Sequence, residues 1–391
     1  MYIRVNSKIL TEAVLPALCA VTPRALLASA SGLRLEANKE ESSLTITGYD
    51  IQKGLTTTIS CEVINEGSML LDGYRLATIC RNIPEGEITL SSDEKYLTTI
   101  SSQKCKFEIS GSSSQNYPTL PILSGERYFS ISQKVLKKML NQVMFSYSVT
   151  DSKPVLTGIY FDVDQDMFQI CTCDGYRISL TKKKIDNEPN YDEKGKAKEK
   201  DFICNFSDHF LVPGKNVVEL SKLLEDSDAP IRIELARKHV IFCFDDKTFF
   251  SRLLDGDYIN YESSLPDDYK TKIIVDLAQI SSAIERVGLL NDEKTKSALH
   301  FCVREDHIIL RCQTSQGRTE ELVDCVIEGD QNTLGFNHRY LVDAFRAALL
   351  SGEEKVEVRL NSHLNGLMIE SVGDNRAEKR FFYLVLPVKL N

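Results

Sequence analysis

The sequence predicts an α+β protein built from three repeated units, each with two helices and antiparallel strands. A capped amphipathic helix opens each unit, at Ser7, Ser132 and Asp276, so the helix starts lie 125 and then 144 residues apart. Later in each unit a strand alternates apolar and polar side chains, with the period of two that places one face on a core. These strands cover residues 87–90, 231–235 and 356–360. A repeat of this length is a domain rather than a solenoid unit.

The first unit is predicted to begin with an edge strand over residues 1–5, which leads into the helix that starts at Ser7. Pro16 lies in the apolar run of this helix, where it removes a backbone donor, so we expect the helix to bend or restart there. A second helix follows near Asp72–Arg75.

The second and third units repeat this plan, with an apolar stripe on each helix and Lys or Arg residues off the stripe. The stripes of the opening helices contain Val135, Leu136, Met139, Leu140 and Val143 in the second unit and Leu277, Ile280, Ile284 and Val287 in the third. The second helices have Val217, Val218, Leu223 and Leu224, and Tyr340, Leu341, Ala344, Phe345 and Leu349. Outside these stripes lie Lys134, Lys137, Lys138 and Asn141, then Lys215 and Lys222, and finally Arg286, Arg339 and Arg346.

Length and composition agree with three domains, which we expect at residues 1–125, 126–267 and 268–391. The 391 residues are 42% hydrophobic and 26% charged, which is ordinary for a soluble globular protein. No apolar run is long enough for a membrane span, and the N-terminus does not resemble a signal peptide. We therefore expect a cytoplasmic protein without a membrane partner.

No pattern points to catalysis or to a metal. The eleven cysteines are scattered and mostly lie in apolar strand contexts, so we expect buried thiols. The six histidines are dispersed, and no phosphate loop, nucleophile elbow or zinc motif occurs. We expect no cofactor, no metal site and no enzyme activity; an active site assembled from distant residues remains an alternative.

Charge is distributed unevenly between the helices and the rest of the chain. The formal net charge is −9, which argues against nucleic-acid binding by the bulk surface. Each of the six helices nevertheless carries a basic residue off its core stripe, so the helices side by side would form a basic surface. The alternative is that these are simply solvated helix faces with mixed charges. The charged tract Lys182–Asp201 is predicted to be a mobile surface loop.

Four motifs together resemble the bacterial DNA polymerase III β subunit family, the replicative sliding clamps. They are Asp174-Gly175-Tyr176-Arg177, Leu254-Asp255-Gly256 leading to Tyr261 and Leu265-Pro266, Gly335-Phe336-Asn337, and the terminal Tyr383–Leu390. The resemblance implies three domains of the DNA-clamp fold, closed as a head-to-tail homodimer ring around duplex DNA. Its role would be to tether the replicative polymerase and so confer processivity. A clamp-like scaffold that binds proteins without encircling DNA is the alternative.

The resemblance also implies a cleft for a partner's peptide motif between the second and third units. Its residues here would be Leu156, Cys173, Gly175, Tyr176, Arg177, Ile178, Ile259, Ser264, Leu384, Val385, Leu386, Pro387 and Val388. Leu386 and Val388 would be apolar anchors, and Arg177 would offer donors to the partner. From the residues alone, 384–388 would be a terminal core strand.

Four positions depart from the family pattern, and one motif is repeated elsewhere. Tyr176, Ile259 and Ser263 stand where the family often has His, Pro and Arg, so the preferred peptide is expected to differ. Asn391 extends past the usual final Leu. A second Asp-Gly-Tyr-Arg, at residues 72–75, is not equivalent to the turn in the cleft.

Further roles carried over from the family concern the ring and its partners. Phe107 and Ile109 would meet Leu289 and Leu290 of the other copy, and DNA would face Arg24, Arg81, Lys134, Lys138 and Lys215. Sequence-independent attraction to phosphates would suit sliding. The expected partners are duplex DNA, a second copy, the polymerase α subunit, other polymerases and repair proteins, and a clamp loader that must be a separate ATPase.

Overall fold

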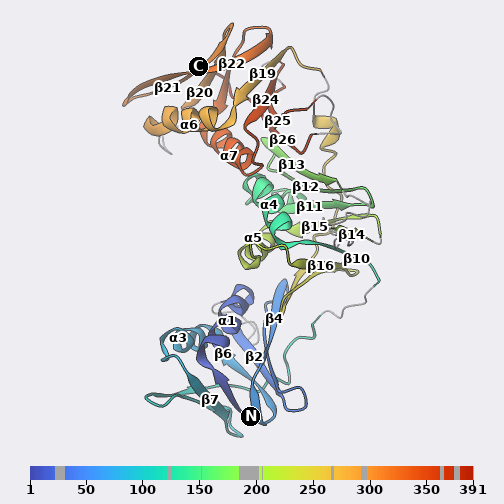
Figure 1. The fold of residues 1–391 in the computed structure, drawn as a ribbon, viewed down its shortest axis with the longest axis vertical. Coiled ribbons are helices and arrows are strands. Elements are labelled where there is room, and N and C mark those ends of the chain that lie inside the picture. Colours follow the sequence, from blue (N-terminus) through green and yellow to red (C-terminus); the bar gives the residue numbers. More distant parts are fainter. Residues whose placement is uncertain are drawn as a thin grey trace, which may run out of the picture. The chain divides into compact units, whose positions relative to one another are not determined.

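The computed structural model describes most of the chain, in ten segments. They are residues 1–22, 31–120, 126–150, 152–184, 202–204, 206–265, 268–291, 297–361, 365–373 and 379–390. The chain divides into two compact units (Figure 1). The first comprises Met1–Gln133, Asp201–Asn205 and Lys222–Leu253, and the second comprises Lys134–Lys200, Phe206–Ser221 and Leu254–Asn391.

The first unit contains two antiparallel sheets and the helices α1 (Ser7–Ala17) and α3 (Gly73–Asn82). The smaller sheet has the order β5 (Glu62–Asn65), β1 (Tyr2–Asn6), β7 (Glu87–Ser92), β8 (Leu97–Ser101) and β9 (Lys106–Ser110). The prediction of an edge strand at the start of the chain was wrong, because β1 pairs with β5 on one side and with β7 on the other. The larger has the order β14 (Phe202–Cys204), β10 (Tyr128–Ser132), β16 (Pro230–Leu235), β17 (His239–Phe244), β18 (Lys247–Arg252), β4 (Lys53–Ser60), β3 (Ser43–Tyr49), β2 (Gly32–Asn38) and β6 (Gly67–Asp72).

The second unit is organised around one twelve-stranded sheet. Its order is β15 (Asp208–Pro213), β11 (Gly158–Val163), β12 (Met167–Cys173), β13 (Arg177–Lys184), β26 (Phe381–Val385), β25 (Leu367–Ser371), β24 (Lys355–Leu360), β19 (Thr271–Asp276), β22 (Gly317–Gly329), β21 (His307–Thr314), β20 (Ala298–Val303) and β23 (Thr333–Asn337). The helices α6 (Leu277–Val287) and α7 (His338–Leu349) contact each other and pack on these strands (Figure 1). The helices α4 (Gln133–Val143) and α5 (Gly214–Leu223) lie mostly in this unit and are joined by a hydrogen bond from Ser221 Oγ to Asn141 Oδ1 (3.1 Å).

The helix starts follow from side-chain caps, with one correction to the sequence prediction. Asp276 Oδ1 accepts from the N–H of Gln279 (2.7 Å) and so caps α6 as predicted. In α1 the cap is Asn6, whose Oδ1 accepts from Lys8 N (2.9 Å). Ser7 was the wrong choice because its hydroxyl is occupied by the N–H of Gly86 (3.2 Å).

Two predicted irregularities turn out differently in detail. Instead of bending at Pro16, α1 ends one residue later and passes into a short 3₁₀ turn, Leu18–Ala20. The proline itself is tolerated because the helix is already ending there. The predicted loop at 182–201 begins too early, since residues 182–184 belong to β13; positions 185–201 lie outside the described residues.

Most of the apolar stripe residues predicted from the sequence lie in the core of the second unit; Leu349, at the end of α7, was predicted wrongly, because it is 41% exposed. Leu277, Ile280, Ile284 and Val287 of α6 are all buried, and Leu341, Ala344 and Phe345 of α7 meet them in one cluster. In α4, Leu136, Met139, Leu140 and Val143 are buried, while Val135 is half-buried. Because burial of these side chains is the main stabilising term, helix packing and not helix propensity holds the elements in place.

The contact between α6 and α7 leaves no room for a side chain at Gly288. A Cβ there would overlap the imidazole of His338, which is held in place by a contact of 2.9 Å from Nε2 to the carbonyl of Ile284. Since Gly288 has φ of −84°, its backbone conformation is open to any residue, and only packing forbids a larger one.

We expect Gly288→Ala to lower the free energy of unfolding by about 1–3 kcal/mol through overpacking. The measurement is the midpoint of chemical unfolding. His338→Ala supplies the matched background, because it removes the ring that the new methyl group would strike. In that background Gly288→Ala should lower the free energy of unfolding by clearly less. An equal decrease in both backgrounds would contradict the explanation.

Candidate functional site

The predicted cleft begins at the hairpin turn between β12 and β13. Gly175 has φ of +90°, a conformation that residues with a Cβ rarely adopt. Asp174 Oδ1 accepts from the N–H groups of Tyr176 (2.9 Å) and Arg177 (3.1 Å), which fixes the turn. The Tyr176 side chain is thereby held in solvent, 62% exposed.

Arg177 is bound on all sides by the chain's own groups. Its Nε donates to Asp174 (2.9 Å), its Nη1 to Asp343 of α7 (2.7 Å), and its Nη2 to the carbonyl of Phe145 (2.6 Å). The guanidinium also lies 4.2 Å from the centre of the Tyr340 ring. These donors were expected to serve a partner, and the structure instead uses them to join the hairpin turn to α7.

Strand pairing brings the distant parts of the predicted cleft together. In the β13–β26 register, Ile178 lies opposite Leu384, and Arg177 lies opposite Val385. Leu156, Cys173, Ile178 and Leu384 are buried in one apolar cluster, against which Ile259 packs. Ser264 ends a 3₁₀ turn, Glu262–Ser264, and is exposed. The sequence prediction of an apolar floor thus corresponds to a real cluster of these side chains.

The C-terminal segment leaves the sheet after Val385 and does not continue as a core strand. The N–H of Leu386 donates to the carbonyl of Tyr176 (2.9 Å), and that of Val388 donates to the carbonyl of Gly335 (2.8 Å). The side chains of Leu386 and Val388 are 36% and 41% exposed. Two apolar side chains are therefore displayed beside the hairpin turn, with Pro387 between them, and Asn391 lies outside the described residues.

Sequence reasoning missed the α7 residues that complete this surface. The rings of Tyr176 and Tyr340 lie 6.3 Å apart, and Tyr340 is only half-buried. We had assigned Tyr340 to the apolar stripe of its helix. The available signal was its position in the first turn of α7, directly after the Gly335–Asn337 motif.

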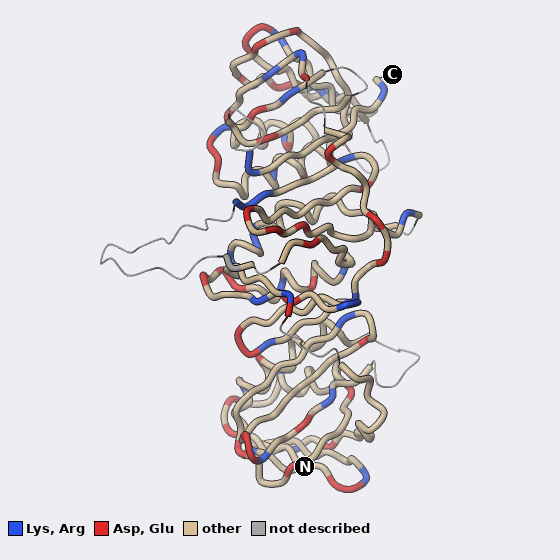
Figure 2. Tube along the Cα trace, turned by 90° about the vertical axis from the view of Figure 1, so that its right-hand side faces the viewer, with Lys and Arg blue, Asp and Glu red and all other residues tan. Residues whose placement is uncertain are grey.

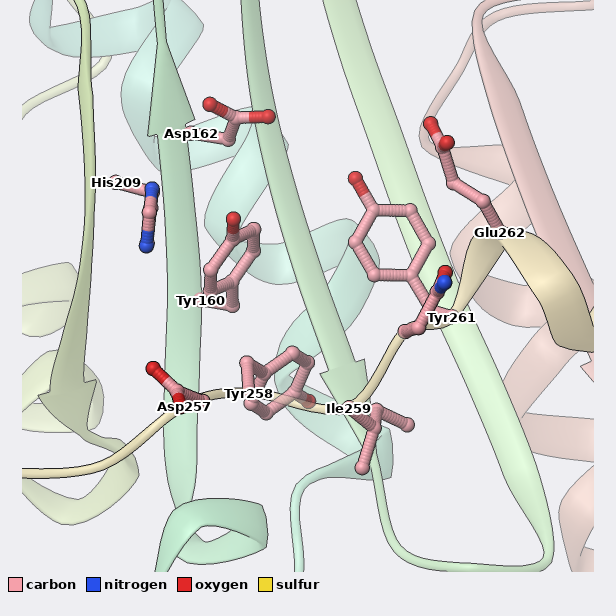
Figure 3. Close-up of a pocket in the computed structure, with 9 residues that line it drawn as sticks. Tyr160, Asp162, His209, Asp257, Tyr258, Ile259, Tyr261 and Glu262 are labelled. Atoms are coloured by element: carbon pink, nitrogen blue, oxygen red, sulfur yellow. The ribbon is translucent and has the colours of Figure 1, made fainter.

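A pocket of about 330 Å³ lies next to the apolar cluster (Figure 3). It is lined by Tyr160 and Asp162 of β11, His209 of β15 and the segment Asp257–Glu262. The sequence prediction included only Ile259 from this set. Ile259, Tyr258 and Tyr261 also pack on the apolar cluster, so pocket and cleft share a wall.

The predicted DNA-facing cations differ in whether their side chains already bind other groups of the chain. Arg81, Lys134 and Lys215 are exposed and form no ion pair with any described residue. Lys138 instead donates from Nζ to the carbonyl of Ser351 (3.0 Å), next to the C-terminal end of α7. Burial, and then the charge of Arg380, lower the pKa of Lys138. Arg24 lies outside the described residues.

Two helix arginines, one in α6 and one in α7, are neutralised by carboxylates. Arg286 pairs with Glu321, and Arg346 donates to Glu285 (2.6 Å). More generally, acidic and basic residues are interspersed along the chain (Figure 2). The unpaired helix cations named above therefore belong to α3, α4 and α5.

The predicted ring contacts lie on two exposed edges. β9 is the last strand of its sheet, with Phe107 and Ile109 half-buried on one face. Leu289 is 79% exposed and Leu290 half-buried, in a short turn that contacts β22. Among the described strands, residues 317–324 of β22 pair only with β21, and Leu322 of this stretch is 56% exposed.

No other chemistry is prominent in the described segments. All eleven cysteines are free thiols, buried or half-buried, and in these segments no three His, Cys, Asp or Glu side chains form a group that could hold a metal ion. Of the helices that the structure describes, none has the length and apolar character to cross a membrane.

Comparisons with known proteins cover the whole length of the chain. Family models of the DNA polymerase III beta subunit match residues 1–121 (N-terminal domain), 130–260 (central domain) and 262–388 (C-terminal domain). The beta sliding clamp of Staphylococcus aureus is 27% identical over 381 residues, 95% of this chain and 94% of the relative. That of Staphylococcus epidermidis is 28% identical with the same coverage.

Solved structures of the same kind superpose closely. The DNA polymerase sliding clamp of Bacillus subtilis has a TM-score of 0.90 at 26% identity and covers 100% of both chains. A putative DNA polymerase III beta subunit of Eubacterium rectale has a TM-score of 0.89 at 26% identity and covers 99% of both.

Proposed function

The chain belongs to the DNA polymerase III beta subunit family and is a DNA sliding clamp, and we propose that two copies close head to tail around duplex DNA. This proposal rests on the three family domains, which follow one another in order over residues 1–121, 130–260 and 262–388. The predicted fold class, three repeated α+β domains of the clamp type, is confirmed by the same matches. We assign no catalytic step to the chain and place it with the DNA in the cytoplasm.

The exposed edges of the two units support the proposed ring. In the proposed dimer β9 of one copy pairs with residues 317–324 of β22 of the other, so that two sheets become one. Phe107 and Ile109 then lie against Leu289 and Leu290. An unpaired apolar edge strand otherwise invites aggregation, and mutual pairing in a closed ring removes both edges.

The cleft residues support binding of a partner's peptide motif. The buried cluster around Leu156 and Leu384 provides an apolar floor, while the exposed Leu386, Val388 and Tyr176 provide side chains that a peptide can cover. We propose that the replicative polymerase α subunit, other polymerases, repair proteins and the clamp loader all dock here. Ser264 and Ile259 form one wall of this cleft.

Retention on circular DNA tests the proposed function. The protein is loaded on a nicked circle with a bacterial clamp loader and ATP, isolated in high salt, and the DNA is then cut. Release only after linearisation is the expected result, because a closed ring is linked topologically to the circle. Release by salt alone would mean ordinary electrostatic binding, and the chain would then act as a protein-binding scaffold.

The exposed helix lysines make a separate prediction about DNA attraction. Lys134→Glu with Lys215→Glu should weaken binding to a short duplex. It should also make the negative slope of log K against log salt shallower, by about 0.9 for each lost phosphate contact. Lys138 is left unchanged because its ammonium group already binds Ser351.

A duplex-binding titration at several salt concentrations measures this slope. The control is Lys39→Glu with Lys95→Glu, which makes the same change of charge in two turns between strands. An equal loss of binding in the control would show that only net charge matters and would remove the assignment of α4 and α5 to the DNA-facing surface.

A further inference from the structure

The pocket in Figure 3 is built by paired strands and by a loop that crosses them. Tyr160 and Asp162 are two residues apart on β11 and therefore lie on the same face of the sheet. His209 of β15 is the cross-strand partner of Asp162. The segment Asp257–Glu262 passes over these strands and lines the pocket, which remains open to solvent.

Tyr160 is the centre of an aromatic cluster. Its ring stacks on Tyr258 at 5.0 Å between centroids with an angle of 8°, and meets the edge of Tyr261 at 6.0 Å. His209 lies 5.7 Å from it. Burial, followed by the charge of Asp162, raises the pKa of Tyr160 to about 12, so its hydroxyl stays protonated.

The lining of the pocket, as far as the structure describes it, is negatively charged and includes no Lys or Arg. Asp162, Asp257 and Glu262 line it, and none of the three forms an ion pair within the described chain. Asp162 receives one side-chain hydrogen bond, from Gln169 Nε2 (3.2 Å). Burial, and then the charge of Asp164, raise the pKa of Asp162 and outweigh the opposing effects of His209 and of the hydrogen bond from Gln169, so its charged form is only partly compensated. A bound cation would stabilise the charged form of Asp162.

The kind of cation follows from the surroundings. The described residues contain no group of side chains arranged to hold a metal ion, and the carboxylates repel phosphates of nucleic acid. Tyrosine rings beside carboxylates are instead the surroundings that a guanidinium or ammonium group prefers. Because Tyr258, Ile259 and Tyr261 also pack on the floor of the peptide cleft, one bound segment can reach both sites.

We propose that this pocket is an additional subsite of the peptide cleft, which takes an Arg or Lys side chain adjacent to the apolar motif of a partner. The inference rests on the proposed peptide binding. The apolar cleft gives the anchor, and the pocket selects among partners by the charge that flanks their motif. Partners that lack a basic neighbour bind through the cleft alone.

The test uses a synthetic peptide from a polymerase α subunit that contains its clamp-docking motif, extended at the end nearer the pocket with Arg-Arg, Gly-Gly or Glu-Glu. Affinities for the full-length protein are measured by fluorescence anisotropy in low and high salt. We expect the Arg-Arg peptide to bind roughly fivefold to tenfold more tightly than the Gly-Gly peptide, from two partly exposed charge pairs, and the advantage to shrink in high salt.

Variants separate the subsite from the cleft. Asp162→Asn with Glu262→Gln should abolish the advantage of Arg-Arg and leave the Gly-Gly affinity unchanged. Asp164→Asn with Glu305→Gln makes the same change of net charge outside the pocket lining and should keep most of the advantage. Equal affinities of the Arg-Arg and Gly-Gly peptides for the wild type would overturn the subsite and leave the cleft standing. Failure of every peptide to bind would overturn both.

Discussion

Replacing Lys379 with alanine is expected to lower the free energy of unfolding of the C-terminal domain by about 3–5 kcal/mol, the usual cost of removing one partner from a buried ion pair. The Lys379 side chain is 1% exposed, and its Nζ lies 2.9 Å from Glu357 and 3.2 Å from Glu370. The two glutamates face each other across β24 and β25, an arrangement of like charges that destabilises a sheet unless a cation lies between them.

Arg359 supplies the second cation of this cluster but cannot replace the first. It pairs with both Glu357 and Glu370, the latter at 2.7 Å. Burial raises the pKa of Glu370 in spite of both cations. Burial also acts on Glu357, but hydrogen bonds from Lys379 and Arg359 outweigh it and hold its pKa below the ordinary value. Lys272, whose side chain is 42% exposed, is a more distant third cation, 3.9 Å from Glu357. Loss of Lys379 therefore leaves the buried Glu370 with Arg359, which it shares with Glu357, as its one ion-pair partner among the described residues.

Chemical unfolding at about pH 8 and about pH 5 measures the effect and its pH dependence. Without Lys379, the pKa of the Glu370 carboxyl in the folded state rises further above the ordinary value of about 4.3. The folded state is therefore stabilised relative to the unfolded state when this carboxyl takes up a proton. The deficit of the variant should consequently be smaller at the lower pH. A deficit that stays constant or grows on acidification contradicts this assignment.

Two variants control for trivial explanations of this result. Arg380→Ala removes the neighbouring cation, whose side chain is 64% exposed and pairs with Glu353 at the surface, so it should cost less than about 1 kcal/mol. Adding Glu370→Gln to Lys379→Ala removes the uncompensated charge and should recover part of the loss.

The repeated tetrapeptide Asp-Gly-Tyr-Arg shows how far local sequence determines structure. At Asp72 it starts α3, because Asp72 accepts from the N–H of Arg75 and the next residues continue an apolar helix stripe. At Asp174 the same letters make a hairpin turn between β12 and β13, because alternating strands flank it. The surrounding periodicity, which the sequence displays, decides between the two structures.

Periodicity also predicted the six helices and most of their buried stripe residues, whereas the apolar floor of the cleft was predicted from the family resemblance. It could not predict contacts between polar residues that are far apart in the chain. Asp343 reaches Arg177 across 166 positions, and Lys379, two residues before β26, reaches Glu357 of β24. Such pairs depend on the register of the strands and on the rotation of the helices. The hydrophobic pattern does not fix either of these to the precision of a single residue. The pocket around Tyr160 was missed for the same reason.

Arg177→Ala is the second change for which we expect a large effect, a loss of about 2–4 kcal/mol in the free energy of unfolding. The side chain is 10% exposed, and its removal leaves Asp174, Asp343 and the carbonyl of Phe145 without a charge-assisted hydrogen bond. Arg177→Lys should recover little, since an ammonium group cannot satisfy three divergent acceptors and also stack on Tyr340.

The same variant distinguishes a positioning role of Arg177 from direct contact with a peptide. If Arg177 acts by holding the turn against α7, Asp343→Asn should reproduce a large part of both the stability loss and the loss of peptide affinity, because Asp343 is its partner on that helix. Tyr176→Ala is the control, because this exposed side chain can contribute to binding without contributing to stability. Reduced affinity in Arg177→Ala with unchanged stability would instead mean that the guanidinium turns to the partner, and that its internal hydrogen bonds yield when a peptide arrives.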